Sequence, residues 1–382
     1  MKIGNVTLAS PFVVAPMAGM TDTAFRRLVK RHGGCGLVVT EMVSSEGLVR
    51  GIDRTLEYAE YTEEERPVSI QIFGGDPEKM AAAAQVVEAM GADIVDVNMG
   101  CPVPKISKHH AGCSLMREPE HAARVIGAMV RAVRIPVTVK MRAGWNDRTR
   151  NAAELACRVQ DAGAAAVTIH GRTAEQSYKG VADWDLVADV ADRLRIPVLG
   201  SGDCVEADHI IEKLQSGVSG GAERGHAARD GGRRTHGIAG VLVGRGVLRN
   251  PWILAQAADL MAGRAPRGVT MAQRGRFLLE YVELLLQERI DEADGFRHIA
   301  PGTATPPPAR GRERWVINKI RALCSWFSKG FEGGSQFRVR VNSCDSVAQL
   351  REIIGEFFFA APQAAPTAAP SVERHGDPVA PA

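Results

Sequence analysis

The sequence predicts an α/β fold: a (β/α)8 TIM barrel followed by a small C-terminal bundle of helices. The main observation is a series of eight short runs rich in β-branched residues, which recur between residues 12 and 246. Stretches rich in Ala, Glu, Met and Val separate these runs, as in strands that alternate with helices. The runs are almost continuously apolar, which is typical of parallel strands that helices cover on both faces.

In chain order, the predicted strands are residues 12–16, 36–41, 68–74, 93–100, 136–144, 166–172, 197–203 and 240–246. The clearest helical patterns between them are residues 76–92, 118–133 and 151–164. Asp76 and Pro77 predict an N-cap and a first-turn proline, while Gly91 and Gly163 predict helix ends. A doubly wound open sheet is the alternative, but no G-x-G-x-x-G follows the first strand.

The predicted barrel covers residues 1–255, and a helical domain covers residues 256–359. Insertions at about 216–237 and 300–312, and the tail 360–382, have the Gly-, Pro- and Ala-rich composition of disordered segments. The N-terminus has the pattern of neither a signal peptide nor a membrane span. Seven cysteines without a C-x-x-C pair favour a reduced, cytoplasmic setting, and we expect no membrane partner.

Basic charge is concentrated near the C-terminus. Residues 310–340 carry eight Arg or Lys against two Glu, although the net charge of the whole chain is only +3. Such a segment is either a solvated helix face or a surface for a polyanion.

Polar or small residues follow every predicted strand. They are Met17, Glu41, Gln71, Asn98 with Cys101, Lys140 with Arg142, His170 with Arg172, Ser201 with Asp203, and Gly244 with Arg245. In a barrel all of these strand ends surround one pocket, so together they predict a functional site. The turns after the seventh and eighth strands lie where barrels commonly hold a phosphate. We expect no metal, since Cys101 and Cys113 lack the partner spacing of structural zinc sites.

Several of these motifs together resemble the tRNA-dihydrouridine synthases, with the bacterial B-type branch nearest. They are "APMAGMTDTAFR" (15–26), "VSIQIFGGDP" (68–77), "DVNMGCPVPK" (96–105), "AGCSL" (111–115), "VTVKMRAGW" (137–145), "TIHGRT" (168–173), "GSGD" (200–203) and "VGRGVLRNPW" (243–252). The resemblance covers about residues 3–255, with a weaker echo at 317–342. It implies a barrel that binds FMN, followed by a helical domain that binds tRNA. It also implies that the protein reduces specific uridines of tRNA to 5,6-dihydrouridine, with NADPH or NADH as electron donor.

The resemblance also implies roles for individual residues. The flavin ring would be held by Pro16, Met17, Ala18, Gln71 and Lys140, and its phosphate side by His170, Ser201, Gly202, Asp203, Gly244 and Arg245. Many relatives have asparagine in place of Ser201. Asn98 and Arg142 would lie near the target base.

Cys101 stands between Gly100 and Pro102, where a strand ends. It is either an incidental turn residue or a thiol presented to the pocket. Reduction of the uracil C5–C6 bond needs a hydride at one carbon and a proton at the other. A thiol with an ordinary pKa of about 8.5 is mostly protonated at neutral pH, so the resemblance favours Cys101 as that acid.

The candidate tRNA contacts are Lys105, in the loop beside Cys101, and Arg321, Arg338 and Arg340 in the basic segment. We expect Trp326 to pack in the core and the protein to be a monomer. The alternatives are a flavin barrel that acts on a small pyrimidine-like metabolite, as dihydroorotate dehydrogenases do, and an RNA-binding protein whose barrel is catalytically idle. A small-metabolite enzyme would not need the basic helical segment.

Overall fold

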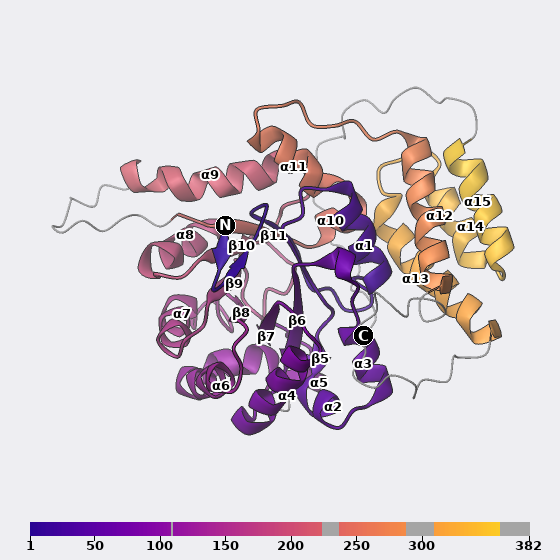
Figure 1. Ribbon diagram of the computed structural model, residues 1–382. Coiled ribbons are helices and arrows are strands. Elements are labelled where there is room, and N and C mark those ends of the chain that lie inside the picture. Colours follow the sequence, from indigo (N-terminus) through magenta and orange to yellow (C-terminus); the bar gives the residue numbers. More distant parts are fainter. Residues whose placement is uncertain (108–109, 224–236, 288–308, 360–382) are drawn as a thin grey trace.

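The computed structural model describes residues 1–107, 110–223, 237–287 and 309–359. Within them, eight parallel strands form a closed ring (Figure 1). In chain order these are β3 (Phe12–Val14), β4 (Leu37–Val39), β6 (Val68–Phe73), β7 (Ile94–Met99), β8 (Val137–Arg142), β9 (Ala166–His170), β10 (Val198–Ser201) and β11 (Gly240–Val243). The pairing of β11 with β3 and of β4 with β6 closes the ring. The predicted (β/α)8 barrel is therefore confirmed.

Apolar residues fill the barrel because each strand has two buried faces. Val13, Val39, Leu199 and Leu242 belong to one apolar cluster, which Ile3 joins from an N-terminal hairpin. That hairpin is β1 (Lys2–Ile3) and β2 (Val6–Thr7). The larger cluster contains the strand residues that face the surrounding helices. A two-residue strand, β5 (Val43–Ser44), adds to the edge of β6.

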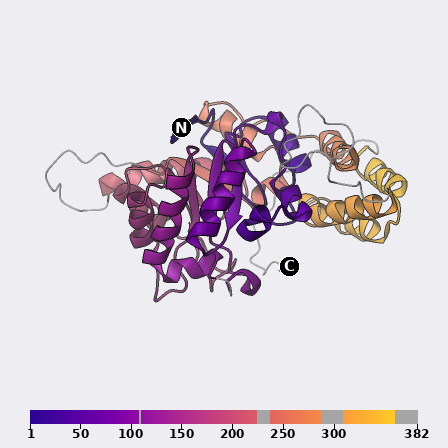
Figure 2. The ribbon, with the colours of Figure 1, turned by 60° about the horizontal axis from the view of Figure 1, so that its bottom comes forward.

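The barrel helices surround the strands (Figures 1 and 2). They are α1 (Thr23–His32), α2 (Ser45–Val49), α3 (Asp53–Ala59), α4 (Pro77–Ala89), α5 (Pro104–Ser107), α6 (Pro119–Ala132), α7 (Ala152–Asp161), α8 (Trp184–Arg193), α9 (Ala207–Glu223), α10 (Arg245–Arg249) and α11 (Ile253–Met261), with 3-10 turns at Glu63–Glu65 and Gly112–Arg117. As predicted, the Asp76 carboxylate accepts hydrogen bonds from the Glu78 and Lys79 amides and caps α4.

The C-terminal helices form a bundle beside the barrel (Figure 2). They are α12 (Met271–Gln287), α13 (Ala309–Phe327), α14 (Gly334–Ser343) and α15 (Val347–Phe359). Buried Phe277, Phe327, Phe337 and Phe358 form its aromatic core. The predicted domain boundary at 255 falls inside α11. No helix in the described parts of the chain is both long and apolar enough to cross a membrane.

The insertions differ in part from the expectation. Residues 216–223 are helical because α9 continues to Glu223, and residues 309–312 already belong to α13. A helix that has formed extends at little cost, so the glycines at 217, 220 and 221 weaken α9 without ending it. Residues 224–236, residues 300–308 and the tail 360–382 lie outside the described residues.

Candidate functional site

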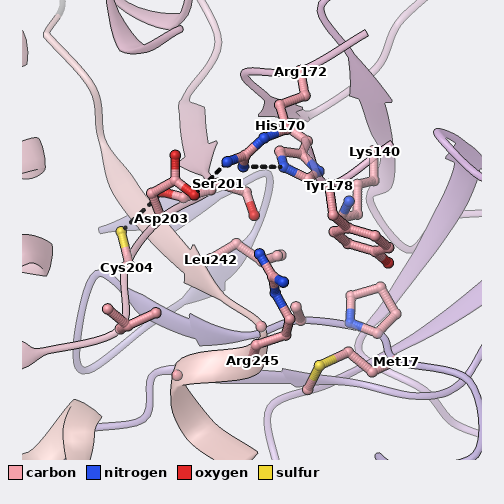
Figure 3. A pocket seen from close by; sticks show the side chains of 16 residues that line it. Met17, Lys140, His170, Arg172, Tyr178, Ser201, Asp203, Cys204, Leu242 and Arg245 are labelled. Carbon is pink, nitrogen blue, oxygen red and sulfur yellow. Dashed lines mark hydrogen bonds and ion pairs between the residues drawn. The ribbon is translucent and has the colours of Figure 1, made fainter. Parts of the chain in front are cut away.

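A cavity of about 110 Å³ opens at the carboxyl ends of the barrel strands (Figure 3). Nine of the predicted cofactor residues line it: Pro16, Met17, Lys140, His170, Ser201, Gly202, Asp203, Gly244 and Arg245. Arg172, Tyr178 and Cys204 are further lining residues. Ala18 is exposed on the loop beyond Met17, and Gln71 is fully buried, so neither lines the cavity. The strand ends therefore meet at one place, as the barrel geometry requires.

The turn after β10 is shaped by two residues with positive φ. Gly202 has φ +123°, and a Cβ there would lie 2.5 Å from the Ala182 Cβ, so only glycine fits. Asp203 has φ +56°. One of its carboxylate oxygens accepts from Arg172 Nη2 at 2.6 Å, and the other accepts from the Ala182 amide at 2.7 Å. Asp203 thus fixes the loop after β9 as well as its own turn.

The cavity is rich in cations. Burial, followed by the charge of Arg142, lowers the pKa of Lys140 to about 8. Burial and the neighbouring charges of Lys140 and three arginines hold the pKa of His170 well below its ordinary value, so its imidazole is neutral. Among the described residues, no oxygen accepts a hydrogen bond from Lys140 Nζ. A half-buried ammonium with that unmet hydrogen-bonding capacity suits an electron-rich ligand.

Cys101 lies in a turn whose backbone is held on both sides. Asn98 Oδ1 accepts from the amides of Gly100 at 3.1 Å and Cys101 at 2.9 Å. Arg142 Nε donates to the Gly100 carbonyl at 2.7 Å, and the Cys113 amide donates to the Cys101 carbonyl. The thiol is half-buried, and burial raises its pKa. It is therefore protonated at neutral pH.

A buried polar network lies behind this turn. Asn98 Nδ2 donates to Gln71 Oε1 at 2.8 Å, and Gln71 Nε2 donates to Asp96 Oδ2 at 2.7 Å. Thr138 Oγ1 donates to the other Asp96 oxygen at 2.6 Å. Burial raises the pKa of Asp96, which these two donors oppose. Gln71 and Asn98, both predicted site residues, are thus oriented by Asp96 and Thr138, which the sequence analysis did not select.

Tyr178 was also not selected, although it lies at the mouth of the cavity. Its ring is 55% exposed, with the Arg245 guanidinium 4.9 Å and the Arg142 guanidinium 6.0 Å from its centre. Arg142 Nη1 donates to the carbonyls of Thr173 and Ser177 and so holds the loop that carries Tyr178. An aromatic residue in a polar loop after a strand was the only sequence signal.

The candidate RNA-binding arginines lie in the bundle and do not line the cavity. Arg321 donates to the carbonyls of Val341 and Cys344, at the C-terminus of α14. Arg338 donates to Ser328 Oγ at 3.0 Å, and the exposed Arg340 pairs with Glu356 at 2.5 Å. Trp326 is half-buried against the core, and its ring centre lies 6.0 Å from the Arg245 guanidinium. Lys105 lies on α5, but its side chain is outside the described residues.

Fold and site together define a (β/α)8 barrel with a cation-lined ligand cavity at the carboxyl ends of its strands. The sequence matches the family model for dihydrouridine synthase over residues 13–305, and the chain belongs to that family. The resemblance found in the motifs is thereby confirmed.

Curated relatives agree with this assignment. A probable tRNA-dihydrouridine synthase of Rickettsia conorii is 34% identical over 94% of this chain and 96% of its own length. One from Rhodobacter capsulatus is 40% identical over 75% of this chain and 83% of its own length. The tRNA-dihydrouridine synthase B of Xanthomonas campestris pv. campestris is 37% identical over 69% of this chain and 73% of its own length.

Proposed function

We propose that this protein is an FMN-dependent oxidoreductase that reduces specific uridines of tRNA to 5,6-dihydrouridine. The observation that carries the proposal is the juxtaposition of a cation-lined cavity with a protonated, backbone-held thiol. Asn98, which holds the Cys101 turn, pairs directly with Lys140 across β7 and β8. The names of the relatives and the family match support tRNA as the substrate.

The residues present fit FMN. Lys140 would direct its ammonium toward the flavin ring, since no oxygen of the described residues accepts a hydrogen bond from it, and Pro16 and Met17 line the cavity beside it. Ala18 lies on the loop beyond Met17, and the Gln71 amide is already hydrogen-bonded to Asp96 and Asn98, so these two residues would act from outside the cavity wall. His170 and Ser201 would hold the ribityl chain, and Gly202, Gly244 and Arg245 would hold the phosphate. Asp203, whose carboxylate accepts from Arg172 and from the Ala182 amide, would fix the turn that contains Gly202. A Cβ at Gly244 would have no neighbour closer than 3.6 Å, so its backbone is open to a ligand. Bound FMN would supply the hydride, received from NADPH or NADH.

Cys101 would supply the proton for the second carbon of the uracil double bond. The raised pKa keeps the proton on Sγ until the uracil carbon accepts it. Asn98 holds the two amides of the turn and Arg142 holds its carbonyl, so the sulfur is kept at one position. Both side chains lie beside the turn, where the target base would be bound.

The target uridine would leave the tRNA stack to enter the cavity, because a stacked base cannot reach a barrel interior. We propose that four residues contact the sugar-phosphate backbone of the tRNA. These are Lys105, in the loop beside Cys101, and Arg321, Arg338 and Arg340, in the helical domain. Among these three arginines, Arg340 is the most exposed to solvent. A phosphate would have to compete there only with Glu356 on the bundle surface. We further propose that the protein works as a monomer in the cytoplasm.

The decisive experiment follows flavin reoxidation. Purified protein loaded with FMN is reduced anaerobically by NADPH, and its absorbance is then followed after addition of unmodified tRNA. We expect faster reoxidation by unmodified tRNA than by orotate or by fully modified tRNA. Equal or faster reoxidation by orotate would favour a small-metabolite enzyme, and a flavin-free protein that still binds tRNA would favour an idle barrel.

A further inference from the structure

Helix α13 of the bundle brings one lysine against the barrel rim. Lys319 is 13% exposed, and its ammonium donates to the Gly19 carbonyl at 3.0 Å. The same nitrogen lies 3.1 Å from Asp22 Oδ2 and 3.6 Å from Glu41 Oε1. Gly19 and Asp22 belong to the loop between β3 and α1, residues 15–22. That loop supplies Ala15, Pro16 and Met17 to the cavity wall.

The tip of this loop has little packing of its own. Gly19 has φ +77°, and a Cβ there would meet no atom within 4 Å. The loop closes on itself through hydrogen bonds from the Met20 and Thr21 amides to the Met17 carbonyl. Met20 packs against the core, and the attachment of Gly19 to the surroundings is polar: Glu41 Oε2 accepts from the Gly19 amide at 2.6 Å, and Lys319 holds the Gly19 carbonyl. The barrel thus holds the amide of Gly19 through Glu41, and the bundle holds its carbonyl through Lys319.

Lys319 also neutralises two carboxylates that lie close together. Glu41 follows β4 and is 4% exposed. Burial raises its pKa, Lys319 opposes that rise, and the neighbouring Asp22 adds to it. Asp22 caps α1 through one oxygen and accepts from Tyr281 of α12 through the other. Without the ammonium, two acidic groups would repel each other beneath the loop.

We propose that Lys319 is a positioning residue for the cavity. By holding Gly19 and neutralising Glu41 and Asp22, it fixes the wall formed by Pro16 and Met17, so this wall is complete only when the bundle is docked. The proposal rests on the proposed function only through the choice of FMN as the ligand tested.

The test uses the full chain with Lys319→Met, Glu41→Gln and the double substitution. Lys319→Met should weaken FMN binding by about tenfold, because Glu41 and Asp22 then lose the ammonium that lies between them and repel each other. Glu41→Gln keeps an oxygen that accepts from the Gly19 amide and removes one charge, so in the double variant it should restore most of the affinity. The matched control is Arg351→Met, which breaks the exposed pair with Glu283 within the same bundle. It should bind FMN as the wild type does.

Two measurements are needed, namely quenching of flavin fluorescence and hydrogen exchange of the amides of residues 17–22. We expect faster exchange in Lys319→Met and its reversal in the double variant. Unchanged exchange and affinity in Lys319→Met, or a loss that Glu41→Gln does not relieve, would overturn the proposal. A wild-type chain that binds no FMN would overturn the proposed function instead, and the exchange measurement would still decide the role of Lys319.

Discussion

The lowered pKa of Lys140 predicts that FMN binding weakens as the pH rises above about 8. Burial is the main cause of the shift from the ordinary value of 10.5, and the Arg142 charge is the second. Below a pH of about 8 the ammonium is charged and can interact with an electron-rich ligand. Above it, the folded protein without ligand loses this proton, so binding must be accompanied by proton uptake.

The expected size follows from linkage. If only the protonated form binds well, affinity falls by at most about tenfold for each pH unit above the pKa. Between pH 7 and pH 9, the dissociation constant for FMN should therefore rise by about tenfold. The stability of the flavin-free protein has the opposite trend. An unfolded chain keeps the Lys140 proton up to its ordinary pKa, so folding becomes more favourable as the pH rises from about 8 toward 10.5.

Fluorescence titration at pH 7, 8 and 9 measures the affinity, and calorimetry in buffers of different ionisation enthalpy counts the protons taken up. Lys140→Arg keeps its charge and Lys140→Met has none, so both variants should bind FMN with a flat pH profile over this range. Lys140→Met should bind more weakly than the wild type at pH 7. Equal wild-type affinity at pH 7 and pH 9, without proton uptake, would refute the argument.

Two other substitutions test the acid and the packing of strand β10. Cys101→Ala should leave flavin reduction by NADPH nearly unchanged and slow uridine reduction by about 100-fold. Single-turnover kinetics would measure both rates. Undiminished uridine reduction would show that Cys101 is not the acid. Gly200→Ala should destabilise the protein by about 1–3 kcal/mol, because a Cβ there would lie 2.1 Å from the buried Trp184 ring, which is itself held by a hydrogen bond to the Gly202 carbonyl. Denaturant unfolding would measure this loss, and the control Gly355→Ala, whose Cβ meets nothing within 4 Å, should show none. Equal free energies of unfolding for Gly200→Ala and Gly355→Ala would contradict the packing argument.

The fold was predictable because parallel strands buried on both faces leave a direct mark on the sequence. The run 12–16, for example, is too continuously apolar for a half-exposed sheet. The cavity residues were predictable for a related reason. Once a barrel is assumed, its geometry brings Lys140, His170 and Arg245 to one rim, however far apart they lie in the chain.

The remaining features depend on contacts that no local pattern encodes. In the sequence, Asp96 is a polar residue inside an otherwise apolar strand. Its two side-chain donors, Gln71 and Thr138, lie on the neighbouring strands and can be identified only from the folded barrel. Arg321 reads as free basic charge. In the structure it donates to two carbonyls at the C-terminus of α14, where cations commonly satisfy unpaired backbone acceptors. Composition reports charge but not whether a donor is already occupied.

The crowding of positive charge in the cavity should lower the stability of the flavin-free protein. Lys140, Arg142, Arg172 and Arg245 all act on His170 and lower its pKa, which means that their positive charges share one poorly solvated region. Asp203 pairs with Arg172, while Asp96 is the carboxylate whose charge raises the pKa of Lys140. Lys140→Met should therefore raise the melting temperature of flavin-free protein, since it removes a poorly solvated charge that donates to no oxygen of the described residues. Because FMN binding stabilises the folded state in proportion to its affinity, the same variant should show a smaller rise in melting temperature when FMN is added. Differential scanning fluorimetry with and without FMN measures both changes. If Lys140→Met instead lowers the melting temperature of the flavin-free protein, the ammonium stabilises the fold. Lys140 would then not favour FMN binding at the expense of stability.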